Sequence, residues 1–147
     1  MHGIRIREMF VQDVPEVLHI EQLSFTSPWS EEAFLIEIHK SYSFTRVAVS
    51  DNAVAGYICV NYILNECHIL NLAVHPRFRR KGIATTLMQE AFSKMGERNC
   101  RFFYLEVRIS NTGAQTFYGR LGFRVAGNRK RYYSSPVEDA VMMMRRV

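Results

Sequence analysis

Apolar residues recur at helical spacing in four segments of the chain, and this periodicity predicts four helices. The first helix follows Asp13 and has Pro15 in its first turn, where a missing N–H is tolerated. The second helix follows Ser30, a favourable N-cap residue with two glutamates directly behind it. The third and fourth helices are predicted over residues 82–99 and 111–121, and Gly122 ends the last of them.

Alternating or continuous apolar runs predict seven strands, at residues 4–9, 44–50, 54–64, 67–75, 101–108, 123–133 and 139–146. Short polar turns separate the second, third and fourth of these runs, which is typical of an antiparallel meander. The run at 101–108 is apolar on both faces, as in a central strand. Strands and helices alternate along the chain without repeats or linkers, so we expect one α/β domain over residues 1–147 with a mixed sheet.

Composition narrows the class of protein. The chain has 147 residues, of which 48% are hydrophobic and 22% are charged, as in ordinary globular domains. Its net charge of +5 favours an anionic ligand or partner. The N-terminal segment lacks the apolar core of a signal peptide, and no run approaches the ~18 apolar residues of a spanning helix. We therefore expect a cytoplasmic monomer that does not enter a membrane.

Cysteine and histidine spacing argues against a metal site. The three cysteines, Cys59, Cys67 and Cys100, form no CxxC pair, so reduced and mostly buried thiols are expected. None of the five histidines is spaced from another as a pair of metal ligands would be. The sequence predicts that the protein holds no metal.

Cationic residues cluster where the third predicted helix begins, at Arg79, Arg80 and Lys81 just before Gly82. Cations are unfavourable at this end of a helix, because the macrodipole is positive there. The free N–H groups of a helix N-terminus bind anions such as a pyrophosphate, and the cations would add to that attraction. Neither a Walker A loop nor a GxGxxG loop is present. Taken alone, one glycine beside a lysine favours a solvated basic loop over an anion site.

Two titratable residues lie in otherwise apolar segments. Glu106 interrupts the strand at 101–108, where partial desolvation would raise the pKa of its carboxyl and make it a better base. A carboxylate paired with Arg108, or simply solvated, is the alternative interpretation of that position. Tyr118 lies beside the apolar stripe of the helix at 111–121, where a tyrosine is usually a core residue with a bonded hydroxyl.

The segment "RRKGIA" resembles the R/Q-x-x-G-x-G/A signature of the GNAT acyltransferase superfamily, and it follows the "LAVHP" that typically precedes that signature. Four longer segments, "IEQLSFTSPWSEEAF", "LNLAVHPRFRRKGIATTLM", "YLEVRISNTGAQTFYGRLGF" and "RKRYYSSPVEDAVMM", are similar to the bacterial ribosomal-protein-alanine N-acetyltransferases, the RimI group. This resemblance implies the GNAT fold: a mixed, mostly antiparallel sheet of about seven strands with four helices. The strands at 67–75 and 101–108 would part to admit the cofactor.

The same resemblance implies acetyl-CoA as the acetyl donor, with the following cofactor-binding residues: Leu72, Ala73, Val74, Arg79, Arg80, Lys81, Gly82, Ile83, Ala84, Thr85 and Asn111. The segment 72–74 would pair with the pantetheine like an added strand. Arg80 to Thr85 would hold the pyrophosphate. An N-cap of the helix at 111–121 is a second interpretation of Asn111, compatible with the first.

Residues for catalysis and for the acceptor also follow from the resemblance. It implies Glu106 as the general base and Tyr118 as the general acid toward sulfur, with direct attack by the amine. It places Trp29, Tyr132, Tyr133 and Glu138 around the peptide groove. Trp29 could instead anchor a loop on the sheet. Strand alternation predicts that just one of the two tyrosines faces the ligand.

The function expected is transfer of acetyl to the N-terminal alanine of a ribosomal protein. A GNAT enzyme acting on lysine side chains or a small amine would share every cofactor residue. A basic nucleic-acid-binding module is the alternative from another class, but no RNP, helix-turn-helix or zinc motif is present, and CoA explains much of the charge.

Overall fold

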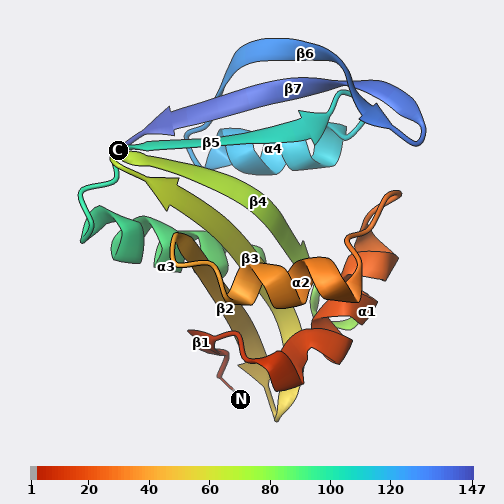
Figure 1. Cartoon of the computed structure of the whole chain (residues 1–147), viewed down its shortest axis with the longest axis vertical. Coiled ribbons are helices and arrows are strands. Elements are labelled where there is room, and N and C mark those ends of the chain that lie inside the picture. The colour runs from red at the N-terminus through yellow and green to blue at the C-terminus, as the bar shows by residue number, and fades with distance from the viewer. Residues whose placement is uncertain (1–2) are drawn as a thin grey trace.

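The computed structural model describes residues 3–147, which form a seven-stranded sheet with strand order β1-β2-β3-β4-β5-β7-β6 (Figure 1). The strands are β1 Arg5–Glu8, β2 Ser43–Ser50, β3 Ala53–Ile63, β4 Glu66–Val74, β5 Phe102–Arg108, β6 Arg124–Ser134 and β7 Val137–Arg146. Within these residues the β4–β5 pair is parallel and the other strand pairs are antiparallel. The predicted mixed and mostly antiparallel sheet is confirmed.

The helices begin where the capping residues predict. The four α-helices of the described chain are α1 Val14–Ser24, α2 Glu31–Ile38, α3 Ile83–Gly96 and α4 Thr112–Arg120. Ser30 Oγ accepts a hydrogen bond from the Ala33 N–H at 3.1 Å, and Asn111 Oδ1 accepts one from the Ala114 N–H at 3.1 Å. The capping interpretation of Asn111 is thus confirmed. Gly122, at φ +92°, ends α4 as expected.

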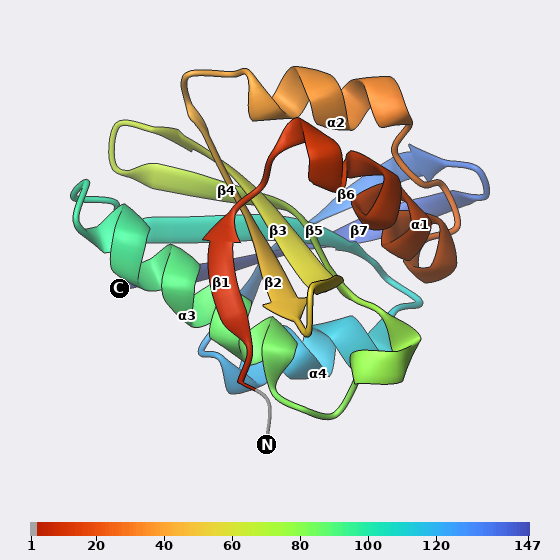
Figure 2. The same cartoon turned by 90° about the horizontal axis from the view of Figure 1, so that it is seen from below.

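Two helices cover each face of the sheet. Figure 2 shows α1 and α2 on one face and α3 and α4 on the other. The core on the α3 and α4 face includes Leu87, Met88, Phe103 and Leu105. The core on the α1 and α2 face is a second cluster, which includes Val17, Phe34 and Tyr57. These buried apolar side chains hold the helices against the sheet, and they therefore determine where the ends of each helix lie.

The sheet opens between its two parallel strands. β4 and β5 pair at three positions, the last joining His68 to Tyr104, and then diverge (Figure 1). The predicted separation of these strands is therefore confirmed. A β-bulge in β4 accompanies it: Cys59 of β3 faces Asn71, but Val60 faces Ile69, so Leu70 has no partner. The bulge changes which side chains face which layer, because Ile69 packs on the α3 side whereas Asn71 bonds to α1.

The β6–β7 hairpin departs from the regular alternation expected for Tyr132 and Tyr133. Pairing shifts register between Arg129 and Tyr133, and Arg131 has a positive φ of +53°. The two tyrosine rings pack edge to face at 5.0 Å between centroids. Simple alternation therefore does not decide which ring faces a ligand.

The three cysteines are buried and unpaired, as expected. Burial raises the pKa of the Cys59 thiol well above its ordinary value, which makes it unreactive. Between residues 3 and 147 no helix is long and apolar enough to cross a bilayer, and no cluster of acidic, histidine or cysteine side chains is arranged to hold a metal ion.

Candidate active site

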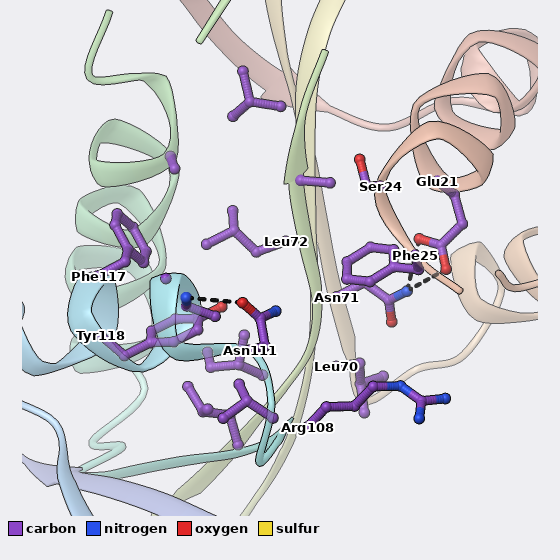
Figure 3. Close-up of a pocket in the computed structure, with 18 of the residues that line it drawn as sticks. Glu21, Ser24, Phe25, Leu70, Asn71, Leu72, Arg108, Asn111, Phe117 and Tyr118 are labelled. Carbon is purple, nitrogen blue, oxygen red and sulfur yellow. Dashed lines mark hydrogen bonds between the residues drawn. The ribbon is translucent and has the colours of Figure 1, made fainter. Parts of the chain in front are cut away.

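A cavity of about 1190 Å³ opens where β4 and β5 diverge (Figure 3). It passes through the sheet: Phe117 and Tyr118 lie on one side of β4, and Glu21 and Phe25 lie on the other. Pockets for drug-sized ligands measure roughly 300–1,000 Å³. The cavity therefore suits one long ligand, or two ligands that meet at the sheet from opposite faces.

The cationic loop forms one end of this cavity. Arg79, Arg80 and Gly82 line it, together with Ile83, Ala84 and Thr85 of the first turn of α3. Arg80 and Gly82 both have positive φ, at +64° and +74°. Gly82 is the N-cap of α3 and has no side chain to cap the helix, so the N–H groups of the first turn have no side-chain cap and can bind an anion. These residues fit a diphosphate.

Lys81 differs from its neighbours. It does not line the cavity, and its ammonium lies 5.8 Å from the centre of the Phe78 ring. We therefore expect the two arginines to contribute more than Lys81 to anion binding.

Arg80→Glu should raise the KM for acetyl-CoA about tenfold or more and change the acceptor KM less. The substitution places like charge beside a site made of N–H dipoles, and a charged hydrogen bond contributes roughly 1.5–3 kcal/mol. Steady-state kinetics with each substrate varied in turn measures both constants. Lys81→Glu is the matched control, because it makes the same charge change one residue away and outside the cavity lining. Equal effects of the two variants would mean that net charge alone, and no built site, attracts the cofactor.

The exposed edge of β4 forms the wall that leads away from this loop. Leu72, Ala73 and Val74 line the cavity, and the pairing with β5 has already ended at His68. Backbone groups on that side of β4 can therefore pair with an extended ligand as with an added strand. Asn111 and Tyr118 complete the lining on the α4 side.

Glu106 lines the cavity with a side chain that is 7% exposed. Its Oε1 lies 2.7 Å from His68 Nε2, and its Oε2 lies 4.0 Å from Arg129 Nε. Burial raises the pKa of the Glu106 carboxyl, but the hydrogen bond and charge of His68, with Arg129 and Tyr132, outweigh burial and leave the pKa below its ordinary value. The expectation of a raised pKa was wrong. The suggested Arg108 partner was also wrong, because Arg108 pairs with Glu138 at 3.1 Å.

The lowered pKa of Glu106 has a consequence for the pH dependence of the reaction. The carboxylate is already ionised at and above its ordinary pKa of about 4.3, so it does not titrate between pH 5 and 8. For an α-amine acceptor, kcat/KM should rise about tenfold per pH unit and level off near the amine pKa of about 7.7–8.0. A pH–rate profile over this range measures it. An extra inflection between pH 5 and 7 that disappears in Glu106→Gln would contradict the assignment.

Tyr118 is 7% exposed and points into the cavity from α4 (Figure 3). Burial, followed by the nearby Tyr133, raises its pKa above the ordinary value for tyrosine. The hydroxyl is therefore protonated at any physiological pH, and it is a hydrogen-bond donor toward a group bound beside β4.

The four residues expected around the acceptor divide into two pairs. Trp29 and Tyr133 line the cavity, whereas Tyr132 and Glu138 do not. Glu138 accepts hydrogen bonds from Arg108 and from the Ser110 N–H at 2.7 Å, so its contacts lie within the protein. Trp29 packs on Phe34 at 5.1 Å between ring centres, which agrees with a loop anchor that also reaches the cavity.

Sequence reasoning did not select Glu21, Asn71 or His68. Glu21 is 1% exposed and accepts hydrogen bonds from the Trp29 N–H, the Tyr57 hydroxyl and the Asn71 side chain. A signal for Glu21 was present, because this carboxylate falls on the apolar spacing of α1. Asn71 and His68 gave no comparable signal, since their partners lie far away in the sequence.

The chain belongs to the acetyltransferase (GNAT) family, whose model matches residues 14–123. It is therefore an N-acetyltransferase of the GNAT type, and the expected fold and enzyme class are confirmed. Family membership favours the enzyme over the nucleic-acid-binding alternative.

Within the family, the chain is similar to enzymes that modify protein N-termini. It is 35% identical to a putative [ribosomal protein bS18]-alanine N-acetyltransferase of Bacillus subtilis, over 94% of this chain and 92% of the relative. It is 32% identical to an N-alpha-acetyltransferase of Saccharolobus solfataricus, over 95% and 91%. The crystal structure of the ribosomal-protein-S18-alanine N-acetyltransferase from Escherichia coli superposes with a TM-score of 0.90 at 28% identity, over 99% and 94% of the two chains.

Proposed function

We propose that this enzyme transfers the acetyl group of acetyl-CoA to the α-amine of a protein N-terminus, with alanine as the first residue and ribosomal protein bS18 as the substrate. The names of the Bacillus subtilis and Escherichia coli relatives support this substrate. The cationic loop at the start of α3, the open edge of β4 and the size of the cavity support acetyl-CoA. The cofactor enters from the α3 and α4 face and the acceptor from the α1 and α2 face.

In the proposed reaction, the amine nitrogen forms a bond to the acetyl carbonyl carbon and the carbon–sulfur bond breaks. Glu106 takes the proton released by the amine, through a bridging water, and passes it to solvent. Tyr118 gives its hydroxyl proton to the departing sulfur, which leaves as the thiol, and Tyr118 then regains a proton from solvent. None of the three buried cysteines lines the cavity, so no acyl-enzyme step on a cysteine is proposed.

The lowered pKa of Glu106 is the observation that favours an α-amine over a lysine. At neutral pH roughly a tenth of α-amines are already unprotonated, because their pKa is about 7.7–8.0. Well under a thousandth of lysine side chains are unprotonated at the same pH, because their pKa is about 10.4. The difference of ~2.5 units corresponds to ~3.5 kcal/mol of deprotonation. Because Glu106 is a weakly basic carboxylate, it is better suited to deprotonating an α-amine than a lysine side chain.

A panel of acceptors tests the proposal. Peptides with free N-terminal residues, lysine peptides and polyamines are incubated with acetyl-CoA, and mass spectrometry maps each acetylated position. We expect acetylation at the α-amine, with N-terminal alanine among the best substrates. Acetylation confined to lysines or polyamines would replace this function with the side-chain or small-amine alternative.

A further inference from the structure

Asn71 has an unusual hydrogen-bonding state for a buried amide. It is 6% exposed and lines the cavity on the α1 face of β4. Its Nδ2 donates to both carboxylate oxygens of Glu21, at 3.0 and 3.2 Å. Its Oδ1 is buried and finds no hydrogen-bond partner among residues 3–147. Leaving a buried acceptor without a donor is destabilising, so such a group calls for an explanation.

Glu21 determines which way the Asn71 amide faces. The carboxylate accepts from the Tyr57 hydroxyl, from the Trp29 N–H at 2.9 Å and from Asn71. Carboxylate oxygens surrounded by donors must face the NH₂ end of an amide, not its oxygen. Figure 3 shows the amide nitrogen turned to Glu21 and the oxygen turned away from it. The orientation therefore does not depend on an arbitrary choice between nitrogen and oxygen.

Arg108 also lines the cavity, and its donors have other acceptors. One nitrogen donates to the Pro136 carbonyl at 3.0 Å and to Glu138 at 3.1 Å, and the other lies 3.3 Å from the Ser135 carbonyl. Its guanidinium also lies 4.4 Å from the centre of the Tyr133 ring. Arg108 therefore donates to other acceptors, and the Asn71 oxygen stays without a partner in the described chain.

The position of Asn71 along β4 relates it to the reacting centre. The cationic loop follows Val74 after a short turn, so a ligand with its phosphates in that loop runs back along Val74, Ala73 and Leu72. The end of that ligand lies next to Asn71. The bulge at Leu70 turns Asn71 to the α1 face, which is the face opposite Tyr118. The Asn71 side chain therefore lies beside the position where an acceptor would meet the end of the cofactor.

We propose that Oδ1 of Asn71 accepts a hydrogen bond from the acceptor's α-amine, and that Glu21 is a positioning residue that holds the Asn71 amide in the required orientation. This inference rests on the proposed function. The amine gains positive charge as its nitrogen attacks. The Glu21 carboxylate, acting through the oriented amide dipole, makes the cavity beside Asn71 favourable for that charge.

The experiment compares two ligands on the enzyme loaded with CoA, which cannot react. One is a peptide with an N-terminal alanine, and the other is the same peptide with a propionyl group in place of alanyl, which lacks only the amine. Wild type should bind the free-amine peptide about ten- to a hundredfold more tightly by calorimetry, the range for a hydrogen bond to a charged donor. Asn71→Ala should bind the two peptides alike, with an unchanged Kd for CoA.

Three further variants separate recognition of the amine from general structure. Asn71→Ser keeps a small polar side chain and withdraws the amide oxygen, so it should lose the preference even if Asn71→Ala is unstable. Glu21→Gln should weaken the preference, because the Asn71 amide can then turn over, whereas a purely structural role would lower both affinities together. Asn61→Ala is the matched control: Asn61 also has a buried Oδ1 without a partner within the described chain, but it does not line the cavity.

Retention of the preference in both Asn71 variants would overturn the inference, as would equal binding of the two peptides to wild type. Failure of the proposed function would appear in the acceptor panel instead, because the wild-type enzyme would then acetylate an amine other than the α-amine. In that case the comparison is repeated with that amine and its desamino analogue, and the same two results overturn or support the role of Asn71.

Discussion

Glu106→Gln should reduce turnover by roughly a hundredfold or more, the usual contribution of a positioned acid–base group. The glutamine keeps the size of the side chain and cannot take a proton from the attacking amine. The substitution also removes the carboxylate that lies 2.7 Å from His68 Nε2 and 4.0 Å from Arg129 Nε, but it leaves the cationic loop untouched. Acetyl-CoA should therefore bind as tightly as before, which direct titration measures alongside kcat.

A matched control is available on the neighbouring strand. Glu66 of β4 is exposed and lies outside the cavity lining, so Glu66→Gln makes the same chemical change away from the reaction. This control should retain full turnover. If Glu106→Gln is also nearly fully active, solvent alone removes the amine proton and the role proposed for Glu106 is wrong.

Tyr118→Phe should lower turnover by a similar factor, roughly a hundredfold or more. The raised pKa of Tyr118 keeps its hydroxyl protonated, so the wild-type side chain can donate to the sulfur throughout the working pH range. Phenylalanine preserves the edge-to-face contacts with Phe117 and Phe123, at 5.1 and 5.5 Å, and removes the donor alone. Thermal stability should change little while kcat falls.

Tyr62→Phe serves as the corresponding control, because the Tyr62 hydroxyl bonds to the Ser41 carbonyl at 3.2 Å and lies outside the cavity lining. It should leave kcat unchanged. Nearly full activity of Tyr118→Phe would mean that the thiolate leaves without help from this residue.

The parts of the fold that depend on local patterning could be predicted from the sequence. The helix starts at Ser30 and Asn111 follow from capping chemistry, and both caps are present. The motif around Gly82 indicated an anion site at the start of α3, and the structure places this residue at one end of the cavity. These features depend only on residues that are close together in the chain, so they can be predicted from a single sequence.

Features that depend on distant partners could not be predicted. The pKa of Glu106 is lowered by His68, which is 38 residues away and reaches Glu106 only because β4 and β5 are parallel neighbours. Spacing alone suggested the opposite direction. The alternation of apolar and polar residues along β4 likewise gives no sign of the bulge at Leu70. The bulge nevertheless determines that Asn71 faces Glu21.

The acceptor side shows the same limit. Alternation predicted that just one of Tyr132 and Tyr133 faces the ligand, but it could not identify Tyr133 as the one that lines the cavity. Glu138 was expected beside a substrate, whereas in the folded chain it accepts hydrogen bonds from Arg108 and from the Ser110 N–H. Residue type and position suggested a region of the molecule for the acceptor, but the contacts within that region required the structure.

One matched pair of peptides tests the central claim most directly. The first has a free N-terminal alanine and acetylated lysines, and the second has a blocked N-terminus and free lysines. Initial rates are measured for both at neutral pH with saturating acetyl-CoA. Because a weakly basic Glu106 suits an amine with a pKa of about 7.7–8.0 far better than one of about 10.4, the first peptide should be acetylated and the second should remain nearly unmodified. Preferential acetylation of the second peptide would contradict the assignment of this enzyme to protein N-termini.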